Sequence, residues 1–382
     1  MKTQKSQKIY WILFGITCLL FCGLYISLIF NQNIWTDEAY TIQLIRENSF
    51  TGIITGTAND VHPPLYYLML KIFINVFGDS IPVYKLFSIC PLILCFVLAG
   101  TKIRKYWGEQ TSLLFVFFIN AIPCLLEYVI QIRMYSWALL WVTWAAVSAY
   151  GVYRERGISN QLQLTMATLL ACYTHNYAMI SCVIIYGILA VTLLRKPKQW
   201  LISGVIVAVC YIPWLLVLYQ QTMNRIGNYW IDPVTGKEIV GYTGFLFDSS
   251  IPYSSWMLGL LCIMAVVQCI KAIRAKEERG AVALCMLGVP LFTATIGIIV
   301  SVVVTPFFIA RYLIPCIGLL ALFLAISFGE QKTYLKILLI LFSCVMFVSA
   351  YRINYTKEYE STRTQELLDY MNENMGENDY II

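Results

Sequence analysis

Charged residues are scarce in this chain. Asp, Glu, Lys and Arg make up 13% of its 382 residues, whereas a soluble globular domain carries about 25%. Hydrophobic residues make up 59%, and the mean hydropathy is +0.70. This composition excludes a soluble enzyme or binding domain and predicts an all-α polytopic membrane protein. We therefore expect membrane lipids, and not nucleic acid, around the chain despite its net charge of +6.

Paired cysteine motifs are also lacking, and histidine is rare. The 13 cysteines all lie within apolar stretches and form no C-x-x-C pair, which is typical of small hydrophobic side chains in buried helices. The sequence therefore indicates neither a disulfide framework nor a cysteine metal site. Only His62 and His175 are present, so the position of each is informative.

Apolar runs long enough to cross a bilayer recur along the chain. About 20 apolar residues are needed for one helical crossing. On this criterion we predict eleven spans, near residues 9–30, 83–101, 111–126, 135–153, 161–174, 177–194, 200–219, 255–273, 281–304, 312–328 and 334–350. The run 65–77 is shorter and carries Lys71 in its middle, so its length alone does not decide whether it crosses.

The basic residues decide the position of 65–77. Cytoplasmic loops collect Lys and Arg. If 65–77 does not cross, six basic clusters with 17 of the 27 basic residues share one side; if it crosses, the first cluster opposes the other five. The clusters are Lys2/Lys5/Lys8, Lys102/Arg104/Lys105, Arg154/Arg156, Arg195/Lys196/Lys198, Lys271/Arg274/Lys276/Arg279 and Lys332/Lys336. We therefore predict that 65–77 is an interfacial helix on the outer surface.

This topology defines the expected domains and places most polar motifs outside the cell. We expect a transmembrane domain over 1–350, with an external catalytic loop at 31–82, which contains interfacial helices, and a second external loop at 220–254. The glycines and aromatic residues of the second loop are typical of a lid. Residues 351–382 form an external C-terminal segment, read as the start of a small soluble domain. The chain is expected in the plasma membrane, as part of the cell envelope.

Two adjacent carboxylates follow the first span. Asp37 and Glu38 come directly after Trp35 and Thr36. A helix N-cap followed by acids that complement the helix dipole accounts for them without any catalytic role. Two acids in tandem at the membrane surface are also suited to catalysis, so both interpretations stay open at this point.

A third carboxylate stands beside a histidine and two prolines. In Asp60-Val61-His62-Pro63-Pro64, the prolines restrict the residue before them and favour a helix start at 65. His62 is thereby held in a fixed direction. Asp37, Glu38, Asp60 and His62 are suitable ligands for a divalent cation, but their spacing is not diagnostic of one, so a metal site stays open and is not required.

Further polar residues are expected on the same face. Arg133 and Tyr135 lie between two spans, His175 lies in a polar turn, and Arg311 with Tyr312 precedes a late span. An isolated arginine there often extends to the interface. Two on the face that holds the carboxylates indicate instead a site for an anion, because guanidinium groups suit phosphate.

The order of these motifs resembles that of the GT-C membrane glycosyltransferases. The shared features are Asp-Glu after the first span, His-Pro-Pro-Leu, Arg-x-Tyr, a Thr-His turn and a late Arg-Tyr, over about the first 330 residues. The similarity is greatest to the protein O-mannosyltransferases and the lipid A aminoarabinose transferase. It implies a GT-C-like bundle, a polyprenyl-phosphate-linked sugar as donor, and a glycan, lipid or protein as acceptor.

The resemblance also implies roles for particular residues. Asp37, with Glu38 beside it, would be the catalytic base, and Arg133 and Arg311 would hold the lipid phosphate. Asp60, His62, Tyr135, His175 and Tyr312 would complete the substrate site. A single base opposite the leaving group inverts the anomeric carbon, unlike the two carboxylates of retaining hydrolases.

Two other functions remain open. A transporter or flippase would use the same arginines, but its ionisable residues should lie near the bilayer midplane, whereas here they gather at one surface. A polysaccharide polymerase or ligase would depend on the 220–254 loop and leave Asp37 and Glu38 dispensable.

Overall fold

The structure is a computed structural model that describes residues 4–30, 33–155, 157–225, 231, 234–236, 244–245 and 254–374. Its elements are helical throughout this part of the chain, which confirms the predicted all-α class. The α-helices are α1 Gln4–Leu28, α2 Thr36–Glu47, α3 Phe50–Asn59, α4 Leu65–Phe77, α5 Ile81–Leu98, α6 Arg104–Ala121, α7 Pro123–Ile130, α8 Tyr135–Glu155, α9 Ile158–Thr174, α10 Asn176–Thr192, α11 Lys198–Arg225, α13 Ser254–Arg274, α14 Glu278–Val303, α15 Ile314–Phe328 and α16 Thr333–Asn374. A π-helical turn, η1, covers Ala99–Ile103, and a 3₁₀ turn, η2, covers Ala310–Leu313.

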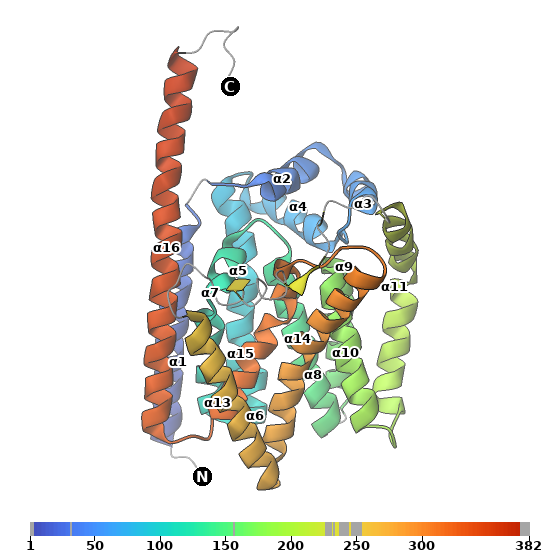
Figure 1. Cartoon of the computed structure of the whole chain (residues 1–382), viewed down its shortest axis with the longest axis vertical. Helices are drawn as coiled ribbons and strands as arrows, with labels where there is room; N and C mark the ends of the chain where they lie inside the picture. The colour runs from blue at the N-terminus through green and yellow to red at the C-terminus, as the bar shows by residue number, and fades with distance from the viewer. Residues whose placement is uncertain are drawn as a thin grey trace.

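Three short helices of the first loop lie across one end of the bundle. In Figure 1, α2, α3 and α4 sit at the top, while the long helices run below them. Lys71 of α4 donates a hydrogen bond to the carbonyl oxygen of Ile45 near the end of α2, at 2.7 Å. Helix α4 thus packs against its neighbour in the loop and does not enter the bundle, as predicted for 65–77.

The chain reverses direction at Gly108, within the apolar run Ile81–Ala121. Gly108 has φ 86°, a left-handed value that favours glycine. The hydroxyl of Ser112 donates to the carbonyl oxygen of Ala99 at 2.7 Å. Thirteen residues of straight helix would separate these groups by about 20 Å. The apolar run Ile81–Ala121 therefore contains two antiparallel helices.

Seven apolar runs in the described residues are long enough to cross a membrane, by length and composition, so this is a multi-pass membrane protein. They take in eight of the eleven predicted ranges, because Ile81–Ala121 holds two of them. The other three ranges are the helices α8, α9 and α10, which do not meet the same criterion. The number eleven is therefore not established, although each predicted range contains helix.

One predicted boundary is wrong. The range 111–126 is not one helix, because α6 ends at Ala121 and α7 begins at Pro123, with extended Ile122 between them. A proline cannot continue the preceding helix. The range 334–350 falls within the candidate span Thr333–Tyr355, and α16 continues beyond that span as one helix to Asn374. In Figure 1 this helix runs beside α1 and then projects past the top of the bundle.

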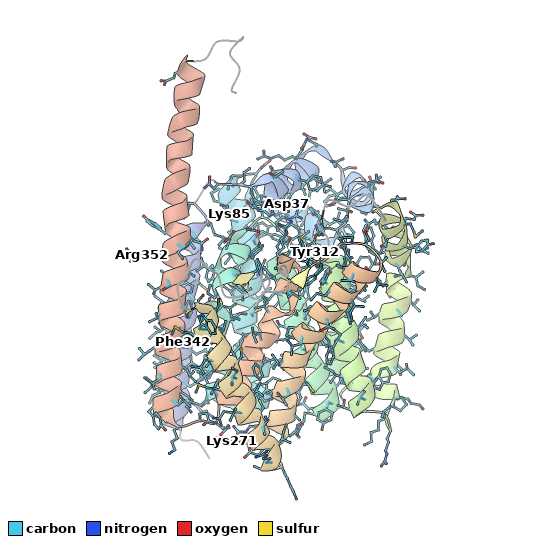
Figure 2. The ribbon with its side chains drawn as sticks, in the orientation of Figure 1. Asp37, Lys85, Lys271, Tyr312, Phe342 and Arg352 are labelled. Atoms are coloured by element: carbon cyan, nitrogen blue, oxygen red, sulfur yellow. The ribbon has the colours of Figure 1, made fainter. Side chains whose placement is uncertain are left out.

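The basic clusters gather at the end of the bundle opposite the first loop. Lys105 pairs with Glu155 at 2.6 Å, and Arg154 pairs with Glu278 at 2.9 Å, which joins the regions of three clusters. Arg104 lies over the ring of Trp11, near the N-terminus. Figure 2 places Lys271 at the bottom and Asp37 at the top. These contacts agree with the prediction from the sequence that the basic clusters lie on one side of the membrane.

Helix α15 is the central element. Of the apolar window in Ala310–Phe328, 94% is buried, whereas the other candidate spans are buried over 56% or less. Its neighbours include α6, α8, α13 and α14. Because η2 leads directly into α15, Arg311 and Tyr312 lie at the start of the most buried of the candidate spans.

Helices α13 and α14 approach each other most closely at Gly280. A Cβ atom added to Gly280 would lie 2.5 Å from the carbonyl oxygen of Cys269, a backbone atom that cannot move alone. We expect Gly280→Ala to destabilise the protein by about 1–3 kcal/mol through overpacking. Thermal unfolding in detergent measures this. Gly259→Ala, whose Cβ meets nothing within 4 Å, is the control. Equal melting temperatures for the two variants would contradict the close approach.

Candidate active site

The first turn of α2 presents Asp37 and buries Glu38. Both oxygens of Glu38 accept backbone hydrogen bonds, from Ile132 N–H at 2.6 Å and from Trp35 N–H at 3.1 Å. Burial raises the pKa of the Glu38 carboxyl, and these two hydrogen bonds oppose that rise. Glu38 thus fastens the start of α2 to the turn between α7 and α8. Asp37, one residue earlier, keeps 31% of its side chain exposed.

Arg133 is hydrogen-bonded to the backbone of Asp37 and to two nearby hydroxyl groups. Its Nη1 donates to the Asp37 carbonyl oxygen at 3.1 Å, to the Thr41 hydroxyl at 3.1 Å and to the Tyr67 hydroxyl at 3.4 Å. Its Nη2 lies 3.9 Å from the Asp37 carboxylate, and the side chain is only 3% exposed. The guanidinium therefore connects α2 with α4 and fixes the direction of Asp37.

Arg311 lies near the same oxygen of the Asp37 carboxylate as Arg133. Its Nη2 lies 3.5 Å from Asp37 Oδ2, and its guanidinium lies 5.1 Å from the centre of the Trp35 ring. This side chain is 21% exposed. The separation of 3.5 Å is long for a charge-assisted hydrogen bond. Arg311 is thus positioned at Asp37 with its hydrogen-bonding capacity only partly used.

Both histidines lie together beside Arg311. The ring centres of His62 and His175 are 5.8 Å apart, and His175 lies 5.4 Å from Tyr312 and 5.7 Å from Tyr135. Asn176 donates from Nδ2 to the carbonyl oxygen of Val61 at 2.9 Å, which holds the His-Pro-Pro segment against the α9–α10 turn. Residues from three separate parts of the sequence thereby meet.

The imidazoles are neutral at physiological pH. Burial, and after it the positive charge of Arg133 and Arg311, lowers the pKa of His175 to about 3. Burial and then Arg133 likewise hold the pKa of His62 well below its usual value. Nδ1 of His175 accepts from Tyr177 N–H at 3.1 Å, so its proton is on Nε2. His175 can therefore donate to a neutral oxygen.

The low pKa of His175 predicts a pH dependence of stability. Between pH 6.5 and about 3 the unfolded chain binds the proton and the folded chain does not, so stability falls as the pH falls. From pH 7.5 to pH 5 this histidine contributes a loss of roughly 2 kcal/mol. We expect His175→Gln to reduce the drop in melting temperature over that interval. An unchanged pH dependence in the variant would contradict the neutral, buried state.

Two cavities adjoin η2. The first, here named the apolar cavity, has a volume of about 380 Å³, lies between α10, α11 and α14, and ends at His62, His175 and Tyr312. The second, the polar cavity, has about 520 Å³ and is lined by Trp35, Glu38, Lys85, Glu127, Gln131 and Arg311, among others. The consecutive residues Arg311 and Tyr312 therefore line different cavities, with Asp37 against Arg311.

The four suggested metal ligands do not converge. No group of three His, Cys, Asp or Glu side chains that could hold a metal ion occurs in the described part of the chain. Glu38 is engaged by two amides, and His62 faces His175 and Tyr312. Asp60 ends α3, where its N–H donates to the carbonyl oxygens of Gly56 and Thr57.

Lys85 is a site residue that the sequence analysis missed. It lies on α5, is 3% exposed, and donates to the carbonyl oxygen of Asn33 at 2.9 Å in the wall of the polar cavity. Figure 2 shows it at the same end of the molecule as Asp37 and Tyr312. A lysine inside an apolar span is a signal of function in itself, and it was available in the sequence.

The predicted external loop 220–254 lies mostly outside the described residues. Its first residues continue α11 to Arg225, and the proposed lid falls on positions of which little is described. Gln221, at its start, lines the apolar cavity.

Comparison with solved structures identifies the fold. No family model and no curated protein sequence matches the chain. Two crystal structures of ArnT from Cupriavidus metallidurans superimpose on it, in the apo state with a TM-score of 0.60 and bound to undecaprenyl phosphate with 0.59. The chain has a GT-C-like fold. ArnT is an aminoarabinose transferase of that class, so the fold that the sequence resemblance implied is confirmed.

The similarity to ArnT is structural and partial. Identity is 12% to the apo structure and 13% to the lipid-bound one, and the alignments cover 86% and 85% of this chain. The chain spans 61% and 60% of the two ArnT chains. The similarity therefore shows the fold, and the function has to be inferred from the geometry of the residues around Asp37.

Proposed function

We propose that this protein is a glycosyltransferase that moves a sugar from a polyprenyl-phosphate-linked donor to an acceptor at the extracytoplasmic surface. The observation that carries the proposal is the placement of Asp37, a partly exposed carboxylate between two arginines at the membrane-surface end of a GT-C-like bundle. The ArnT structure bound to undecaprenyl phosphate supports a lipid of that class as donor carrier.

Asp37 would act as the general base. A carboxylate that accepts the proton of an acceptor hydroxyl as the new bond forms contributes about 10²–10⁴-fold to the rate. Arg133 and Glu38 hold Asp37 in place through hydrogen bonds with backbone groups, so we assign them to positioning. This differs from the sequence-based role of Arg133 in binding phosphate, because its Nη1 is already shared among three oxygen atoms.

Arg311 would stabilise the leaving phosphate. It lines the polar cavity of about 520 Å³ together with Lys85 and the carboxylates of Glu38 and Glu127, and it is the lining cation that lies against Asp37. Preorganised positive charge of this kind stabilises the charge that develops on a departing phosphate. Attack from the side opposite the phosphate would invert the anomeric carbon.

The distribution of basic residues supports the extracytoplasmic placement. The clusters at the far end of the bundle favour the cytoplasmic side, which leaves Asp37 and Arg311 on the outer side. There a donor can keep its prenyl tail in the bilayer while its phosphate and sugar reach the loop formed by α2, α3 and α4.

A transfer assay tests the proposal. Membranes that contain the protein are incubated with radiolabelled polyprenyl-phosphate sugars, and the labelled product is identified, with and without a chelator. We expect label to leave the lipid phosphate only when the protein is present. Failure to use any polyprenyl-phosphate sugar, with the protein folded in the membrane, would disprove the function.

A further inference from the structure

Three side chains in the wall of the apolar cavity each have one polar atom engaged and one atom without a partner among the described residues. Asn176 donates from Nδ2 to Val61, and Gln221 donates from Nε2 to the carbonyl oxygens of Thr57 and Ala58 at 2.9 and 3.1 Å. His175 accepts at Nδ1. Asn176 Oδ1, Gln221 Oε1 and His175 Nε2 are left buried without a hydrogen bond in this part of the chain.

These bonds fix which atom of each side chain remains available. The amides of Asn176 and Gln221 cannot be reversed, since their nitrogens already donate to carbonyl oxygens. The side chains that line the cavity therefore hold two acceptors and one donor that no described residue satisfies. A buried polar atom without a partner costs about 1–3 kcal/mol, so three at one site are a strong indication of a ligand that completes them.

The apolar cavity carries no formal charge on any of its described lining residues. Its walls are hydrophobic side chains of α10, α11 and α14, with Thr222 and Thr305 as the other hydroxyl-bearing residues besides two tyrosines. His62 and His175 are neutral. The described lining offers no carboxylate to pair with a cation and no guanidinium or ammonium group to pair with an anion, so an uncharged ligand fits it best.

We propose that the apolar cavity binds the acceptor, and that this acceptor is an uncharged amphiphile whose head carries at least two hydroxyl groups. A hydroxyl both donates and accepts, so a diol or a sugar head can meet Asn176, Gln221 and His175 together while its chain lies among the apolar side chains. The inference rests on the proposed transferase function and deepens it by naming the acceptor class.

The two cavities differ in the charge of their lining residues, and this difference distinguishes an acceptor site from a donor site. A lipid phosphate is a poor occupant of a cavity whose imidazoles are neutral, whereas the polar cavity holds both Arg311 and Lys85. An acceptor head at Tyr312 would lie one residue from Arg311 and thus beside Asp37. The two substrates would then approach the carboxylate from opposite sides of η2.

Binding of simple probes tests the acceptor class without turnover. The full chain in lipid nanodiscs is titrated with octyl β-D-glucoside, octyl phosphate and octyltrimethylammonium below their micelle concentrations, and saturation-transfer NMR reports binding. We expect octyl glucoside to bind at least tenfold more tightly than either charged probe. Equal or tighter binding of octyl phosphate would overturn the proposal.

Single substitutions test whether octyl glucoside binds in the apolar cavity. His175→Phe keeps a ring but removes the donor, and Gln221→Met removes the acceptor; each should weaken octyl glucoside binding roughly tenfold. His175→Gln, which retains a donor, should bind nearly as wild type. Gln163→Leu, on α9 and away from the cavity, is the matched control. Unchanged binding in both His175→Phe and Gln221→Met would overturn the assignment even if the probe binds elsewhere.

A competition experiment distinguishes an acceptor-binding cavity from one that binds the prenyl tail of the donor. We expect octyl glucoside still to bind when undecaprenyl phosphate is saturating, with at most a shift in its Kd, and we expect octyl glucoside, but not octyl phosphate, to become labelled in the transfer assay. Competitive displacement by undecaprenyl phosphate would assign the cavity to the donor and defeat the proposal. Absence of all transfer with intact, variant-sensitive probe binding would instead count against the transferase function.

Discussion

Replacement of Asp37 by Asn removes sugar transfer while the protein remains folded. The expected loss in kcat is about 10²–10⁴-fold, the usual contribution of a general base. Folding should survive because the carboxylate is partly exposed and its two ion pairs, at 3.5 and 3.9 Å, are long. Single-turnover transfer from a radiolabelled polyprenyl-phosphate sugar measures the chemical step directly.

Asp79→Asn is the matched control for this experiment. Asp79 lies at the same end of the molecule and is paired with Arg46 at 2.6 Å, on the protein surface. Exposed pairs of this kind contribute at most about 1 kcal/mol to stability, so this variant should keep wild-type transfer. If Asp37→Asn transfers sugar at the wild-type rate, the mechanism proposed for Asp37 is wrong.

Replacement of Arg311 by Ala weakens use of the donor. A charge-assisted hydrogen bond to phosphate contributes about 1.5–3 kcal/mol, which corresponds to a fall of about 10–150-fold in kcat/KM for the donor. Because Arg311 also stabilises the leaving group, part of the loss should appear in kcat. Initial rates at varied donor concentration separate the two effects.

Two further variants make the Arg311 result specific. Arg311→Lys keeps the positive charge but not the planar fork, and it should recover part of the lost activity. Arg46→Ala removes an arginine of the same outer region that pairs with Asp79, and it should leave the donor KM unchanged. Equal donor kinetics in wild type and Arg311→Ala would eliminate the phosphate-binding role.

Much of the fold follows from hydropathy and charge. The run 65–77 is short, and the positions of the basic clusters predict that it lies outside the bundle. Helix α4 occupies those residues and is hydrogen-bonded to α2 through Lys71. Hydropathy is a weaker guide to where helices end. It predicts one span over 111–126 although Pro123 marks a break between α6 and α7, and it does not reveal that α16 continues beyond the span near 334–350 to Asn374.

Motifs in the sequence indicate which residues form the candidate site, but they do not indicate how its side chains are arranged. Asp37, Arg133 and Arg311 were selected from motifs, and the structure brings them together. The sequence did not reveal that Arg133 is buried and shared among three oxygens, because burial depends on how α2, α4 and the α7–α8 turn meet. Asn176 and Gln221 belong to no motif; only their hydrogen bonds to Val61, Thr57 and Ala58 distinguish them.

The placement of Arg311 and Tyr312 on one 3₁₀ turn has a kinetic consequence. Because the turn has a cavity on each side, a molecule that displaces it from one side alters the wall on the other. Occupancy of the two sides is then thermodynamically linked, and each substrate changes the affinity for the other by the same factor. Double-reciprocal plots should intersect, as required when both substrates are present together before the sugar moves.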